Sequence, residues 1–116
     1  MHIAKIEAIA VSLPMIKPVI MAGEEVRRAD NVLLRIESDN GAVGWGEAAS
    51  APTMTGETSA GMIAAIQHLA PALQGRAAQD IAGALAAMDG RMYGNHGAKA
   101  TVEIALRLTP RAALPS

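Results

Sequence analysis

The chain has 116 residues, 51% of them hydrophobic and 18% charged, with ten Lys and Arg against eleven Asp and Glu. This length fits one domain, and a chain of this size hides about two-thirds of the surface that it exposes when unfolded. The formal net charge of −1, without a long run of Lys or Arg, argues against a nucleic-acid partner. No stretch of the sequence resembles a membrane span or a signal peptide, so we expect a soluble, cytoplasmic protein with no membrane partner.

Residues 3–13 are rich in β-branched and small apolar side chains, which predicts a strand that is covered on both faces. Pro14 is expected to end this strand. Residues 15–23, MIKPVIMAG, then mix apolar side chains with Pro18 and Gly23, which favours an irregular apolar loop. Such a loop exposes apolar surface unless something covers it, and exposed apolar surface often marks an interface.

A hairpin is predicted next. Residues 28–38 alternate, with Val32, Leu34 and Ile36 on one face. The Asn40-Gly41 pair that follows predicts a type I′ turn, which needs positive φ at both central positions. Residues 42–48 form the partner strand and contain Trp45, the only Trp in the chain. After this strand, residues 49–55 form a second loop with apolar residues.

From Thr55 the hydrophobic period changes from two to 3.6, which predicts helices. The first helix has Thr55 as its N-cap, Glu57 in its first turn and Gly75 just past its end. A second helix is expected over about residues 78–92 and a third over 98–108. The apolar stripes are Met62, Ile66, Leu69 and Leu73 in the first helix, Ile81, Leu85, Met88 and Met92 in the second, and Thr101, Ile104, Ala105 and Leu108 in the third.

This order of elements predicts an α+β fold, in which a three-stranded antiparallel meander sheet is followed by a three-helix bundle packed on it. Candidate chemistry is sparse. His2, His68 and His96 lie far apart in the sequence and lack a partner at i+3 or i+4, so no metal site is predicted.

Two further features have competing interpretations. Glu47 lies at a strand end, where general bases often occur. No second catalytic group lies at a meaningful spacing from it, so we favour a structural role, in which its carboxylate anchors a backbone group or a cationic side chain. Residues 94–97, Gly-Asn-His-Gly, either present amide N–H groups to an anion at a helix start or form a turn in left-handed conformations. The turn is the simpler interpretation.

Three pieces of the sequence together resemble a known family. The strand end Val43-Gly44-Trp45-Gly46-Glu47-Ala48, the preceding Asp39-Asn40-Gly41 and the later Ala98-Lys99-Ala100 are similar to the N-terminal capping domain of the mandelate racemase and muconate lactonizing enzyme group of the enolase superfamily. The resemblance covers residues 3–106. It implies an enolase N-terminal-like α+β domain on a (β/α)-barrel, whose Mg ion and Lys or His bases abstract the proton α to a carboxylate.

The resemblance also implies that residues 15–23 and 49–55 close over the substrate, with Ile20, Met21, Thr53 and Met54 as the substrate-binding residues. Trp45 is then expected to pack where the last strand ends, and the glycines beside it to leave room for neighbouring groups. The apolar character of the predicted substrate-binding residues suggests a small carboxylate substrate with an apolar or compact distal part.

The catalytic barrel itself has no counterpart in this sequence. A barrel needs about 250 residues, whereas only residues 107–116 follow Leu106. We therefore expect a capping domain over residues 1–108 and a short C-terminal tail over 109–116, truncated before the barrel. We expect such a chain to have no catalytic residue, no metal site and no cofactor of its own, because Mg belongs to the absent barrel. We also expect no turnover from the chain alone. The alternative is a stand-alone binding or oligomerisation module that associates through the exposed apolar loops.

Overall fold

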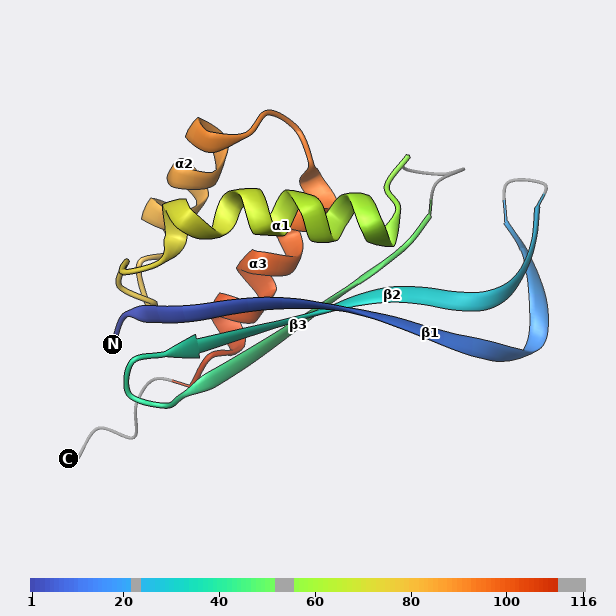
Figure 1. The fold of residues 1–116 in the computed structure, drawn as a ribbon, viewed down its shortest axis with the longest axis horizontal. Coiled ribbons are helices and arrows are strands. Elements are labelled where there is room, and N and C mark those ends of the chain that lie inside the picture. Colours follow the sequence, from blue (N-terminus) through green and yellow to red (C-terminus); the bar gives the residue numbers. More distant parts are fainter. Residues whose placement is uncertain (22–23, 52–55, 111–116) are drawn as a thin grey trace.

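The computed structural model describes residues 1–21, 24–51 and 56–110, with the backbone alone over residues 13–21 and 24–29. Strands β1 (Ile3–Met21), β2 (Glu24–Ser38) and β3 (Val43–Ala49) form one antiparallel sheet in the order β1-β2-β3. Helices α1 (Ser59–Leu73), α2 (Ile81–Arg91) and α3 (His96–Leu108) follow in the chain and pack together beside the sheet (Figure 1). The predicted α+β fold, a meander sheet followed by a three-helix bundle, is confirmed.

The core lies between the sheet and the helices. In β2, Val32, Leu34 and Ile36 are completely buried, as their alternation predicted. The helices add Met62, Ala65, Ile66, Leu69, Leu73, Ala84, Met88, Ala98, Val102, Ala105 and Leu106. The predicted stripe of the first helix is therefore confirmed. In the predicted stripe of the second helix Met88 is buried, whereas Ile81, Leu85 and Met92 are only partly buried against the core. No helix in the described part of the chain covers the other face of the sheet, which we call the open face.

The first strand does not end at Pro14. β1 continues to Met21, which pairs with Glu24, and its register with β2 shifts between Pro14 and Val19. β1 is an edge strand, so the backbone N–H groups that face away from β2 make no hydrogen bond within the sheet. Pro, which lacks a backbone N–H, is tolerated at such positions. The predicted strand end is therefore wrong, and so is the predicted irregular loop over residues 15–21, while residues 22–23 lie outside the described residues. Coverage on both faces is also wrong, since Ile9 is 43% exposed.

The turn between β2 and β3 contains Asp39, Asn40 and Gly41. Ser38 N donates to Ala42 O at 2.8 Å, and Gly41 N donates to Ser38 O at 3.0 Å. Within this described turn Gly41 alone has positive φ, at +86°. The predicted hairpin is confirmed but the type I′ turn is wrong, because this is a three-residue loop with Gly in the left-handed position.

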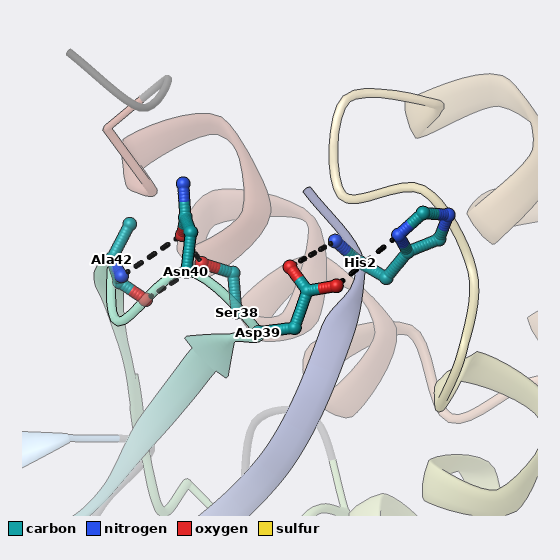
Figure 2. Close-up of polar contacts among 5 residues, drawn as sticks. All are labelled: His2, Ser38, Asp39, Asn40 and Ala42. Atoms are coloured by element: carbon teal, nitrogen blue, oxygen red, sulfur yellow. Dashed lines mark hydrogen bonds and ion pairs between the residues drawn. The ribbon is translucent and has the colours of Figure 1, made fainter. Parts of the chain in front are cut away.

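Side chains hold this turn in place, as Figure 2 shows. The Asn40 side-chain oxygen accepts hydrogen bonds from the Ser38 hydroxyl and from Ala42 N, the latter at 3.1 Å. The Asp39 carboxylate accepts from His2 N at 3.0 Å and lies 3.3 Å from His2 Nδ1. The hydrogen bond from the His2 backbone is the main reason that the pKa of Asp39 lies below its ordinary value. These contacts tie the start of the chain to the hairpin.

Helix starts depend on side-chain caps. Thr58, and not Thr55, caps α1, because its hydroxyl oxygen accepts from Gly61 N at 3.0 Å. Asp80 caps α2 at Gly83 N, also at 3.0 Å, so this helix begins later than residue 78. Each cap satisfies a free N–H of the first turn. Gly75, with φ of +85°, follows the end of α1 as predicted.

Among the described residues, no helix is both long enough and apolar enough to cross a membrane.

Candidate functional site

The two segments predicted to contact substrate leave the sheet at the same end. β3 ends at Ala49, which pairs with Asn31 in β2, and Ser50 N then donates to Asp30 O at 2.7 Å. Beyond this point β1 and β2 continue alone as a two-stranded arm, residues 12–21 and 24–30. Figure 1 shows the arm projecting past the helical layer. The roots of both segments therefore lie side by side.

The structure places two of the four predicted substrate-binding residues. Ile20 and Met21 lie in the arm, paired with Glu25 and Glu24 respectively, so they belong to a strand and not to the expected loop. Thr53 and Met54 lie outside the described residues.

The segment that follows β3 is closed at its base. Ala51 N donates to Glu57 O at 3.0 Å, and the two residues form an antiparallel bridge. The Glu57 side chain continues to α3, where Oε2 accepts a hydrogen bond from Gly97 N at 3.1 Å. The predicted position of Glu57 in the first turn of α1 is wrong, because that helix begins at Ser59. Its partner is 40 residues away in the sequence, so no local signal could have revealed the contact.

Residues 94–97 form the predicted left-handed turn. Gly94 and Asn95 have φ of +63° and +55°. A helix start is also a place where backbone N–H groups bind anions, and the anion at Gly97 is the chain's own Glu57. A Cβ at Gly97 would lie 2.6 Å from that carboxylate. Both interpretations of this stretch therefore hold in part.

Trp45 does not pack into the core. It is 47% exposed on the open face, paired with Arg35 in β2, so its expected packing is wrong. The glycines beside it face α3 instead. A Cβ at Gly44 would lie 2.1 Å from Ala105 O, and one at Gly46 would lie 2.4 Å from Thr101 O. The expectation that these glycines leave room for neighbours is confirmed, because α3 packs directly on the β3 backbone.

Two charged side chains of the sheet, Glu47 in β3 and Arg35 in β2, each bind a neighbouring side chain. Exposed Glu47 accepts a hydrogen bond from Asn31 Nδ2 at 2.5 Å, so the group it binds is an amide and neither of the predicted partners. Arg35 donates to Glu37 at 2.8 Å, and this bond holds the pKa of Glu37 below its ordinary value.

Lys99 is the buried cation of α3. Its Nζ donates to Asp89 Oδ1 at 2.9 Å and to Met92 O at 2.5 Å, so it bridges α3 to the end of α2. A cation beside the C-terminus of a helix also interacts favourably with the helix dipole. Lys99 therefore has a structural role here.

Among the side chains that the structure describes, residues 1–12, 30–51 and 56–110, no three His, Asp or Glu residues gather closely enough to hold a metal ion. These described side chains do not offer the cluster of oxygen ligands that Mg requires. A cavity of about 210 Å³ lies at the far end of the sheet from the arm, lined by Met1, Ala78, Gln79, Ile81, Leu106, Arg107 and Thr109.

Residues 5–109 match the family model for the mandelate racemase / muconate lactonizing enzyme N-terminal domain. The chain is 39% identical over 107 residues to the L-Ala-D/L-Glu epimerase of Bacillus subtilis, covering 91% of this chain and 29% of the epimerase. It is 38% identical over 109 residues to the chloromuconate cycloisomerase of Cupriavidus pinatubonensis, with 91% and 29% covered.

Solved structures agree with these sequence matches. The substrate-liganded complex of the Bacillus subtilis epimerase has a TM-score of 0.84 at 39% identity, over 91% of this chain and 30% of that chain. The dipeptide epimerase of Cytophaga hutchinsonii, complexed with Mg and the dipeptide D-Ala-L-Val, has a TM-score of 0.88 at 30% identity, over 91% and 29%. The chain thus spans under a third of the length of these relatives. It belongs to the mandelate racemase and muconate lactonizing enzyme N-terminal domain family of the enolase superfamily.

Proposed function

We propose that this chain is the substrate-specificity capping domain of a Mg-dependent enolase-superfamily enzyme that acts on the proton α to a carboxylate. The observation that carries the proposal is the family match over residues 5–109. The relatives are an epimerase and a cycloisomerase. Inverting a centre next to a carboxylate requires a base to remove the α proton and an acid to return one, with the enolate stabilised in between.

The proposed division of roles follows the length of the match. The chain spans 29% of the Bacillus subtilis epimerase, so the Mg ion and the bases belong to a catalytic barrel that this stretch does not contain. The arm and the segment after β3 contribute Ile20, Met21, Thr53 and Met54 to the substrate site. Their apolar side chains suit a small carboxylate with a compact or apolar distal part, such as a dipeptide, another amino-acid derivative, a mandelate-like acid or a muconate.

A chimera tests this proposal. Residues 1–109 replace the corresponding N-terminal domain of the Bacillus subtilis epimerase, and kcat/KM is measured with Mg for a panel of dipeptides and muconates. We expect turnover with a substrate profile that differs from the parent's, and no turnover from this chain without the barrel. Met21→Ala and Met54→Ala in the chimera should each change the preference between substrates by about tenfold, as contacts of one or two methylenes do.

Gln67→Ala, on the exposed side of α1, is the matched control and should leave the profile unchanged. A folded, active chimera with the parent's profile, unchanged by both Met substitutions, contradicts the role in specificity.

The second candidate function is the stand-alone binding or oligomerisation module. One observation favours it: Ile104 and Leu108, one turn apart on α3, are 45% and 63% exposed. An apolar pair of this kind can contribute to a contact between copies of the chain.

A further inference from the structure

We propose that Glu57 is a positioning residue, whose carboxylate fixes the base of the segment between Ala51 and Glu57 against the start of α3. The link to specificity rests on the proposed function, which assigns this segment to the substrate site. The contacts themselves do not depend on that assignment.

Both ends of the segment meet at the end of β3. Ser50 N continues the sheet by donating to Asp30 O at 2.7 Å. One residue later, Ala51 N donates to Glu57 O at 3.0 Å, and Gly56 has the positive φ of +77°. The backbone of Glu57 is therefore tied to the end of β3.

The Glu57 side chain is tied to a different element, helix α3. Its Oε2 accepts from Gly97 N in the first turn of α3 at 3.1 Å. Among the described residues the N-cap position, Asn95, makes no capping bond, and its amide instead donates to Tyr93 O at 2.9 Å. Since a helix start favours a carboxylate that accepts from its free N–H groups, Glu57 supplies the cap from 40 residues away.

Helix α3 is itself packed tightly on β3. Its backbone lies so close to Gly44 and Gly46 that a Cβ at either position would meet a helix carbonyl oxygen. The contacts thus form a closed path from β3 to Ala51, through Glu57 to α3, and back to β3. A displacement of the segment's base away from the helical layer must break the bond between Glu57 and Gly97.

Amide hydrogen exchange on the 116-residue chain, followed by NMR, tests this proposal. The Ala51 amide reports on the base, because its acceptor is the Glu57 backbone, which side-chain substitutions keep. Glu57→Ala should raise the Ala51 exchange rate by about five- to tenfold more than the rate of the core Leu34 amide, as the loss of a cap predicts for local opening. Glu57→Gln keeps an acceptor oxygen and should restore most of the protection.

Two further variants sharpen the result. Asp80→Ala removes a similar carboxylate cap, at Gly83 N of α2, and should leave the ratio of the Ala51 and Leu34 rates at its wild-type value. Gly97→Ala places a Cβ 2.6 Å from the Glu57 carboxylate and should reproduce the effect of Glu57→Ala. If Glu57→Ala and Gly97→Ala both leave that ratio unchanged, as Asp80→Ala does, the positioning role is overturned. The experiment requires no turnover, so its failure is distinguishable from a failure of the chimera.

Discussion

Two glycines in β3 decide how closely a helix approaches the sheet. Gly44 and Gly46 are buried and face α3, where any side chain would enter the space of Ala105 O or Thr101 O. The neighbouring Trp45 points to the open face. The glycines of this strand therefore form a face on which a helix backbone can pack, and the larger side chains lie on the opposite, open face.

Gly46→Ala tests this contact. The new Cβ would lie 2.4 Å from a backbone oxygen that cannot move alone, so we expect a loss of about 1–3 kcal/mol in the free energy of unfolding, measured with urea. Gly90→Ala is the matched control. It lies within α2, where a Cβ would meet no described atom within 4 Å, and should stabilise the chain by about 0.5–1 kcal/mol. The same sign for both substitutions would contradict the close packing of α3 on β3.

Single residues also show the limits of local patterns. Asn40-Gly41 correctly predicted a hairpin, yet the turn is a three-residue loop and not type I′. The Asn40 side-chain oxygen accepts from the Ser38 hydroxyl and from the Ala42 backbone N in this loop. Thr55 was the predicted cap of the first helix, but the Thr58 hydroxyl fills the role by accepting from Gly61 N. Residue type alone does not distinguish two nearby residues that can make the same bond.

Among the elements, α3 departs most from its predicted packing. Its expected apolar stripe included Ile104 and Leu108, but these are exposed, while Ala98, Val102 and Leu106 are buried. A helical period is compatible with more than one face, and the face chosen here is the one that can meet the glycines of β3. The prediction of a helix was right, and its predicted stripe was right at Thr101 and Ala105, which are buried, and wrong at Ile104 and Leu108.

Two leucines on α3 test this assignment. Leu106 is 4% exposed and Leu108 is 63% exposed. Leu106→Ala should lower the free energy of unfolding by about 2–5 kcal/mol, because it leaves a cavity in the core. Leu108→Ala should change it by less than about 0.5 kcal/mol, as exposed substitutions do. Denaturant unfolding of both variants measures the difference, and equal losses would indicate that the predicted stripe was the buried one after all.

The arm is the other element that local patterns missed. Pro14 was expected to end a strand and Pro18 to lie in an irregular loop, whereas β1 continues through both. Its position at the edge of the sheet permits this. Strand order is a property of the assembled sheet, so the sequence around these prolines could not reveal it.

For the molecule as a whole, the open face and the outer side of α3 leave apolar side chains exposed, including Ile9, Trp45 and Leu108. The module hypothesis predicts that these surfaces associate. Sedimentation velocity at micromolar concentration measures this, with Leu108→Glu as the variant. A dimer that the variant converts to monomer supports the module, and a wild-type monomer at every concentration contradicts it and leaves the capping role as the sole proposal.

The sequence by itself determined the order of strands and helices, the core face of β2, the buried stripe of α1, and the family. These follow from hydrophobic periods and from short motifs, which are local. Tertiary structure alone decided that β1 passes through its prolines, that α3 turns its small residues to β3, and that Glu57 caps a helix 40 residues away. Each of these depends on which elements become neighbours, and a contact between distant residues leaves no periodic trace in either segment.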